Sequence, residues 1–275
     1  MVTRQTVSIV GCGWLGLPLA INLISKGYQI KGSTTTRDKL VILKNKGIDP
    51  YLVHFDNSSP PESGDLLDTD ILIINIPPGR RSENGTGNYR QMADYFSREI
   101  PHTKIKKIIL VSSTSVYSDT NTIVSETDLP LPSSPTGKLM LEVENQFLTI
   151  QHKHICIIRC AGLVGPERHP SRFFKDKTGI PNGLSPVNLI HRDDVIGIII
   201  QLIANDNARG VYNASSPFHP TKQEFYGKAA EALNKQSPVF IPEKKSWKVI
   251  SSVRVEEELT YAFKFPDLRD WLKED

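Results

Sequence analysis

The sequence has few cysteines, little net charge and no long apolar run, and each shortage excludes a class of protein. Three cysteines without paired spacing in 275 residues give no metal site and are typical of a reducing compartment. The 33 basic and 30 acidic residues are scattered and leave a net charge of +3, so no nucleic-acid partner is expected. The longest apolar run, residues 195–204, is too short to cross a bilayer. No secretory signal precedes Val7, and we therefore expect a cytoplasmic protein without a membrane partner.

Short apolar segments alternate with helical patterns over the first 160 residues. The predicted strands are residues 6–10, 28–32, 51–56, 71–76, 105–112 and 154–160. The helical patterns include residues 15–27, with Leu15, Leu19 and Leu23 on one face and a glycine stop, and residues 37–46. This alternation predicts an α/β fold with a doubly wound parallel sheet of the Rossmann type.

The alternation stops near residue 160, where a loop-rich segment punctuated by prolines begins. Helical patterns follow at residues 194–204 and 222–233. We therefore expect a Rossmann domain over residues 1–160 and a smaller substrate-binding part over residues 161–275.

A glycine motif, Gly11-Cys12-Gly13-Trp14-Leu15-Gly16, stands between the first predicted strand and the first predicted helix. In a dinucleotide-binding loop the first glycine permits a tight turn, the second lets the pyrophosphate approach the backbone, and the third lets helix and strand pack. The helix N-terminus then faces the phosphates with unpaired N–H groups. The context makes this spacing a strong prediction of a dinucleotide site, against the alternative of a glycine-rich turn without a ligand.

The second predicted strand lacks the acidic residue that would hold the adenosine ribose of NAD. Gly32-Ser33-Thr34-Thr35-Thr36-Arg37 stands there instead, with no acid before Asp38. Thr36 and Arg37 suit the 2′-phosphate of NADP, which a guanidinium grips with parallel hydrogen bonds. The sequence therefore favours NADP, with NAD as the alternative cofactor, unless Arg37 is an ordinary exposed residue opening a helix.

Ser112-Ser113-Thr114-Ser115-Val116-Tyr117 follows a predicted strand, and Lys138 precedes Glu142 by four residues. In these motifs the chain resembles the extended short-chain dehydrogenases/reductases, the NAD-dependent epimerase/dehydratase superfamily. There a strand ends in Ser-Ser-x-x-Val-Tyr, and a later helix carries Tyr-x-x-x-Lys-x-x-x-Glu. The likeness continues at Arg159 to Pro166 and at His191 to Val195, and so covers almost the whole chain.

The resemblance implies roles for single residues. Ser113 aligns with the catalytic serine or threonine that bonds the substrate oxygen, and Lys138 with the lysine that binds the nicotinamide ribose. Asp56 matches the aspartate that holds the adenine amino group, and Ile76-Pro77 lies where the backbone passes beneath the cofactor. The alternatives without a cofactor role are that Asp56 is an ordinary loop or cap carboxylate and that Lys138 is a solvated helix residue.

Two departures mark the chain as an atypical member. The first two glycines of the motif are two residues apart, whereas most extended members have them three apart. Ser134 stands where the family carries its tyrosine, the usual proton donor. Tyr117, water held by Ser113, or His191 are the candidate replacements, although His191 is as readily explained by a structural hydrogen bond. Asp193 and Asp194 are interpreted as caps of the helix that follows them.

The function expected is a hydride transfer between NADP and a carbonyl or hydroxyl carbon, or an epimerase/dehydratase reaction on a nucleotide sugar. A small-molecule substrate is the expected partner, and the oligomeric state is left open. The rival is an NADP-binding redox sensor without turnover, which the missing tyrosine favours. A Rossmann methyltransferase is a third candidate, which Ser113 and Lys138 disfavour.

Overall fold

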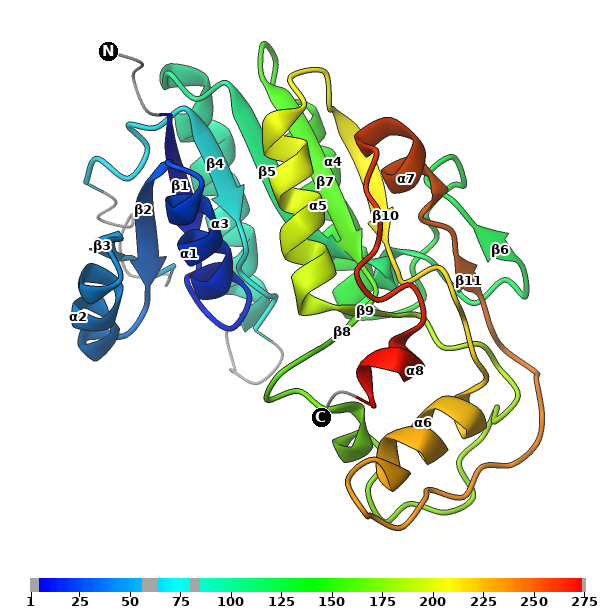
Figure 1. Cartoon of the computed structure of the whole chain (residues 1–275). Helices are drawn as coiled ribbons and strands as arrows, with labels where there is room; N and C mark the ends of the chain where they lie inside the picture. The colour runs from blue at the N-terminus through cyan, green and yellow to red at the C-terminus, as the bar shows by residue number, and fades with distance from the viewer. Residues whose placement is uncertain (1–4, 56–63, 80–84, 274–275) are drawn as a thin grey trace. The chain divides into compact units, whose positions relative to one another are not determined.

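A seven-stranded parallel sheet with the order β10-β7-β5-β4-β1-β2-β3 forms the centre of the fold (Figure 1). The computed structural model describes residues 5–55, 64–79 and 85–273. The strands of this sheet are β1 (Thr6–Val10), β2 (Gln29–Thr34), β3 (Asp49–Leu52), β4 (Ile71–Ile74), β5 (Lys107–Ser113), β7 (His154–Cys160) and β10 (Gly210–Ala214). Strand β1 pairs with both β2 and β4, so the winding of the chain reverses there. Dinucleotides bind at such a reversal in this class of sheet, and the predicted α/β Rossmann class is confirmed.

The central strands form because they are short apolar runs that the helices cover on both faces. Every residue of β4 is buried, as are all but the first residue of β1. Such continuous burial is typical of parallel strands. The third strand lies earlier in the chain than the predicted residues 51–56. It begins at Asp49 and ends at Leu52, because its pairing with β2 runs from Lys31↔Asp49 to Thr34↔Leu52. Pro50 is tolerated in β3 because this strand lies at the edge of the sheet.

Four helices connect the strands of the first half. They are α1 (Gly16–Ser25), α2 (Arg37–Asn45), α3 (Gly85–Glu99) and α4 (Pro135–Leu148). Helix α1 ends at Ser25, just before the predicted stop at Lys26-Gly27, and Gly27 has a φ of 93° that glycine tolerates. Helix α3 was not predicted, although Tyr89, Met92, Ala93 and Phe96 bury one helical face. Helices α3 and α4 pack together on the face of the sheet opposite α1 (Figure 1).

The chain divides into two compact units. The first contains the residues up to Ser113 together with Ser134–Ile158 and Ile199–Val211, and the second contains Thr114–Ser133, Arg159–Ile198 and the residues from Tyr212 onward. A single boundary at residue 160 therefore does not describe the units, because the chain returns to the first unit after residue 133 and again after residue 198.

The second unit is built around two small sheets and three helices. Strand β6 (Ile123–Val124) pairs with β11 (Val249–Ile250), and β8 (Gly162–Val164) pairs with β9 (Leu189–His191). The helices are α6 (Lys222–Glu231), α7 (Val253–Leu259) and α8 (Leu268–Trp271). Its buried core includes Val164, Phe225, Phe265, Leu268 and Trp271.

Helix α5 (Arg192–Ala204) contributes residues to both units. It begins two residues before the predicted helix, and α6 ends two residues before its prediction. Within the described residues, no helix combines the length and the apolar character needed to span a membrane.

Candidate cofactor site

The three motif glycines have different surroundings, and these match the three roles that the motif requires. Gly11 has a φ of 101°, and a Cβ there would lie 2.5 Å from the carbonyl oxygen of Asn75. A Cβ on Gly16 would run into the carbonyl oxygen of Gly11. A Cβ on Gly13 would meet no atom of the described residues within 4 Å. Gly11 and Gly16 are therefore needed for packing, whereas Gly13 borders open space.

Two polar side chains hold the loop in place. The backbone N–H of Gly11 donates to Ser33 Oγ at 3.0 Å, and the N–H of Cys12 donates to the Ser33 carbonyl at 2.8 Å. On the other side, Asn75 Nδ2 donates to the Gly11 carbonyl at 3.2 Å. Ser33 and Asn75 thus tie the loop to the ends of β2 and β4. The sequence analysis assigned neither residue this role, because the pairing of neighbouring strands decides it.

A cavity of about 310 Å³ lies beside the loop, within the first unit. Of the residues predicted to bind the cofactor, those lining it are Gly11, Cys12, Gly13, Ile76 and Pro77. The other lining residues come from the ends of β2 and β4, the segment after β3, helix α2, and α3 with the residues near its start: Ser33, Thr34, Thr35, Lys39, Val53, Phe55, Asn75, Gly79, Gly85, Asn88 and Tyr89. The cavity therefore combines the glycine loop, hydroxyl groups and one lysine at the reversal of the sheet.

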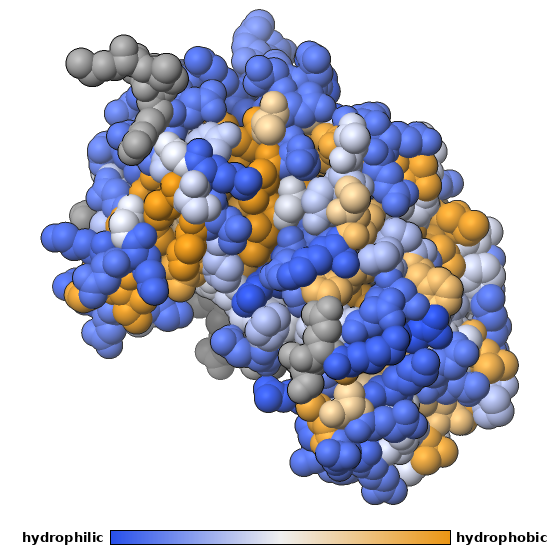
Figure 2. Space-filling view, in the orientation of Figure 1, coloured by the Kyte–Doolittle hydropathy of each residue, from blue (hydrophilic) through white to orange (hydrophobic). Residues whose placement is uncertain are grey.

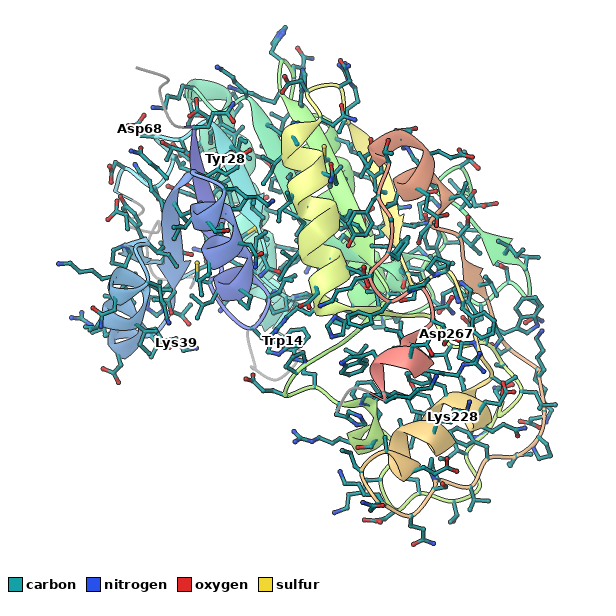
Figure 3. The ribbon with its side chains drawn as sticks, in the orientation of Figure 1. Trp14, Tyr28, Lys39, Asp68, Lys228 and Asp267 are labelled. Atoms are coloured by element: carbon teal, nitrogen blue, oxygen red, sulfur yellow. The ribbon has the colours of Figure 1, made fainter. Side chains whose placement is uncertain are left out.

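The remaining predicted cofactor residues lie elsewhere. Leu15 and Gly16 are buried where α1 begins, and Trp14 precedes them in the loop (Figure 3). Lys138 is exposed on the first turn of α4. Asp56 lies outside the described residues.

The predicted 2′-phosphate contact needs a correction in its detail. Thr36 is the N-cap residue of α2 and Arg37 is its first residue, both exposed, and neither lines the cavity. Lys39, two residues further along α2, does line it (Figure 3). Residues two apart on a helix point about 200° away from each other. The sequence indicated a cation at the start of α2, but the helix phase presents Lys39 to the cavity.

Cys12 lines the cavity as an inert thiol. Its side chain is 5% exposed, and burial raises its pKa to about 12. A thiol with this pKa carries almost no thiolate at neutral pH, and so it is not a nucleophile.

The predicted catalytic strand end is anchored to α4. Ser113 is the last residue of β5 and is half-buried. Its neighbour Ser112 donates a hydrogen bond to Glu144 of α4, whose side chain is fully buried. The hydroxyl of Ser112 is therefore used in a structural hydrogen bond, and the catalytic role of Ser113 stays a prediction.

Ser134, predicted to stand at the place of the family tyrosine, has a structural role. It is the N-cap of α4, and its Oγ accepts a hydrogen bond from the N–H of Gly137 at 3.0 Å. Pro135 at the first helical position completes a favoured helix start.

Tyr117 is held by hydrogen bonds inside the second unit. Its hydroxyl accepts from Arg159 Nη1 at 2.5 Å and donates to Asn213 Oδ1 at 3.2 Å, and its side chain is 3% exposed. Burial raises the pKa of Tyr117, and the nearby Arg159 offsets only part of that rise. Because a proton donor in this family needs a lowered phenol pKa, these contacts oppose the proposed role of Tyr117, which remains a prediction.

The His191 segment is used for packing. His191 is buried, and its ring centroid lies 4.4 Å from that of Phe265. Asp194 is fully buried and accepts from Tyr261 Oη at 2.9 Å and from the N–H of Lys264 at 2.6 Å. Asp193 and Asp194 do lie in the first turn of α5, as the helix-cap interpretation expected, but the Asp194 carboxylate binds the segment before α8. The described residues contain no group of three or more possible metal ligands.

Comparison with known proteins agrees with this geometry. No family model matches the chain. UDP-glucuronic acid 4-epimerase from Bacillus cereus, solved with NAD, is 19% identical with a TM-score of 0.81, and the match covers 98% of this chain and 96% of the epimerase. dTDP-glucose 4,6-dehydratase from Bacillus anthracis str. Ames, also solved with NAD, is 16% identical with a TM-score of 0.75 and coverage of 98% and 95%. The fold is thus that of the extended short-chain dehydrogenases/reductases, the NAD-dependent epimerase/dehydratase superfamily, as the motifs predicted.

A relative with higher sequence identity shows the family to which the chain belongs. Protein YeeZ of Escherichia coli (strain K12) is 38% identical over 268 residues, which cover 96% of this chain and 97% of YeeZ. The chain belongs to the family of Protein YeeZ.

Proposed function

We propose that the protein is an NADP-dependent enzyme of the oxidoreductase or epimerase/dehydratase kind, acting in the cytoplasm on a carbonyl compound or a nucleotide sugar. The observation that carries the proposal is the open space at Gly13, between two glycines that packing requires, at the reversal of a parallel sheet. A pyrophosphate fits there because no side chain occupies the space and the N-terminus of α1 follows the loop. The NAD complexes of the epimerase and the dehydratase with this fold support a nicotinamide dinucleotide.

The end of β2 favours NADP over NAD. Thr34, Thr35 and Lys39 line the cavity there, and no acidic side chain is among its described lining residues. The ammonium of Lys39 and the threonine hydroxyls suit a phosphate, whereas a ribose diol is normally held by a carboxylate.

Ser113 and Lys138 supply the chemistry that remains without a tyrosine. A nicotinamide bound in the first cavity would supply the hydride transfer to or from the substrate carbon. Ser113 donates a hydrogen bond to the substrate oxygen, and Lys138 holds the cofactor ribose. Ser134 caps α4, Tyr117 is held by Arg159, and His191 is buried, so we take the proton to come from water held at Ser113.

Cofactor titration tests the proposal directly. Quenching of protein fluorescence by NADPH and NADH gives both affinities, and we expect NADPH to bind roughly tenfold or more tightly, because a charge-assisted hydrogen bond contributes about 1.5–3 kcal/mol. Lys39→Ala should remove this preference, and Lys44→Ala, on the exposed last turn of α2, is the matched control. Arg37→Ala tests the residue that the sequence favoured. Equal affinities in the native protein would contradict the NADP assignment.

Turnover separates the enzyme from the second candidate, a redox sensor that binds NADP without reaction. The sensor is favoured by the structural use of Ser134 and by the hydrogen bonds on Tyr117. NADPH oxidation over a panel of carbonyl compounds and nucleotide sugars should be weak, and it should be lost in Ser113→Ala and Lys138→Ala. Tight NADPH binding with no turnover of any compound would favour the sensor.

A further inference from the structure

A second cavity, of about 260 Å³, lies within the second unit. Its walls come from Thr114 and Asp119 after β5, from residues 185–189 leading into β9, from α6, and from residues 246–248 before β11. Thr114 follows Ser113 directly in the chain. The cavity is therefore lined from four segments distant in sequence, one of which begins beside the predicted catalytic serine.

The cavity wall carries two lysines and one carboxylate. Lys248 Nζ donates to Asp119 Oδ1 at 2.8 Å and to the carbonyl of Tyr117 at 3.0 Å, and its side chain is 16% exposed. Asp119 also accepts from Ser246 Oγ at 3.1 Å. The Lys248–Asp119 pair is thus satisfied internally and closes the loop after β5 onto the segment before β11.

Lys222 is the second cation of the wall, and its charge, after the contacts of Lys248 and Ser246, also helps to lower the pKa of Asp119. It is the first residue of α6 and is half-buried, and its ammonium has no hydrogen-bond or ion-pair partner within the described part of the chain. The wall therefore has a net charge of +1, carried by Lys222. A positive charge in the wall of a polar cavity is a reason to expect an anionic ligand.

The N-terminus of α6 does not itself offer an anion site. The N–H of Lys222 donates to the Ser185 carbonyl at 2.9 Å, and that of Gln223 donates to the Gly183 carbonyl at 3.0 Å. The N–H of Glu224 donates to the capping residue Thr221 at 3.3 Å. Since these amides are satisfied, attraction of an anion depends on the Lys222 side chain.

The size and surface of this region limit what the cavity holds. A volume of 260 Å³ encloses a ligand of monosaccharide size, whereas a nucleoside diphosphate sugar would extend out of the cavity, as a dinucleotide would from the 310 Å³ cavity of the first unit. The surface over α6 and α8 is mostly hydrophilic with small separate apolar patches (Figure 2), unlike a protein-docking face. Ser185, Ser246 and Trp247 also line the wall, and because Ser185 Oγ donates to the Ser246 carbonyl at 3.2 Å and Ser246 Oγ donates to Asp119, these two hydroxyls serve a polyhydroxy ligand as acceptors.

We propose that this cavity binds the substrate, a small polyhydroxy compound that carries one phosphate or carboxylate, through its anionic group at Lys222. The proposal rests on the proposed function in taking the ligand to be the substrate, and within that function it favours a small anionic sugar, which the cavity can enclose. Binding of the anion itself does not depend on the cofactor.

Calorimetry on the full chain tests this with glucose 6-phosphate, glucuronate, neutral glucose and UDP-glucose as probes. We expect at least one of the two anionic sugars to bind, glucose to bind about tenfold more weakly or not at all, and UDP-glucose to bind no more tightly than the better anionic sugar. The phosphate and the carboxylate probe distinguish the two sources of charge. The proposal would be overturned if UDP-glucose alone bound tightly, or if neither glucose 6-phosphate nor glucuronate bound.

The matched variants are Lys222→Met and Lys228→Met, both on α6. Lys228 is exposed on the same helix (Figure 3) and does not line the cavity. Lys222→Met should weaken the anionic sugar about tenfold, and Lys228→Met should leave it unchanged. Native-like binding by Lys222→Met overturns the proposal. Titration of NADPH in the same samples separates the two claims, because failure of NADPH to bind rejects the proposed function while anion binding stands.

Discussion

Gly13→Val is expected to abolish cofactor binding and leave the fold intact. A Cβ at this position meets no described atom within 4 Å, and its backbone φ is outside the left-handed region. The substitution should therefore change the free energy of unfolding by no more than about 1 kcal/mol. The side chain would fill the space where the pyrophosphate approaches the loop. Because this side chain would keep the pyrophosphate away from the loop, we expect the NADPH affinity to fall on the order of a hundredfold or more, about 2.7 kcal/mol.

Gly16→Ala is the contrasting variant in the same loop. Its Cβ would clash with the Gly11 carbonyl, so helix and loop must move apart. Overpacking of this kind costs about 1–3 kcal/mol. For a chain of this size each kcal/mol lowers the melting temperature by about 2–4 °C. Gly16→Ala should thus lose stability, whereas Gly13→Val should lose only binding.

Thermal unfolding by circular dichroism and calorimetric titration of NADPH measure the two effects on the same samples. Native-like NADPH binding by Gly13→Val would place the dinucleotide elsewhere. A large drop in its melting temperature would refute the claim that the space at Gly13 is free.

Three further outcomes are expected. Ser134→Ala should lower the free energy of unfolding in urea by about 0.5–2 kcal/mol, because the helix cap is lost, and should lower turnover only moderately. A variant that is stable but inactive would assign Ser134 a chemical role. Burial lowers the pKa of His219 below its ordinary 6.5, so the unfolded chain binds more protons and the free energy of unfolding falls as the pH drops below about 6.5. This dependence is at most about 1.4 kcal/mol per pH unit, and His219→Gln should reduce it. An unchanged dependence in the variant would contradict the assignment to His219. All three cysteines are buried, and burial raises the pKa of Cys12 and of Cys160 to about 12, so a thiol reagent at pH 8 should label the native protein only after denaturation; rapid labelling would refute this.

The fold could be predicted because its signals are local. Each central strand is a short apolar run, and the glycine motif fixes where the first strand ends and the first helix begins. These features are read from neighbouring residues without knowledge of tertiary contacts. The course of the chain between the two units could not be read in this way, because residues 114–133 and 199–211 join their units through contacts distant in sequence.

The candidate site was predictable in its backbone and less so in its side chains. The loop from Gly11 to Gly16 follows from spacing alone. The choice between Arg37 and Lys39 depends on the rotational phase of α2, and the loop contacts of Asn75 depend on which strands are neighbours. The contacts of the Asp194 carboxylate could not be predicted, because its partners near Lys264 are 70 residues away.

If residue 134 is the place of the family tyrosine, as the motif spacing predicts, the structure gives the serine there another use. A phenol at residue 134 would serve proton transfer, but it would not cap α4 as the Ser134 hydroxyl does. That cap stabilises the helix turn on which Lys138 stands, and Glu144 further along the helix binds Ser112 beside Ser113. Helix α4 therefore still positions the two residues that bind cofactor and substrate in the proposed function, while the proton donor is gone. This arrangement suits a substrate that takes its proton from water, and it predicts a slow, substrate-restricted reaction.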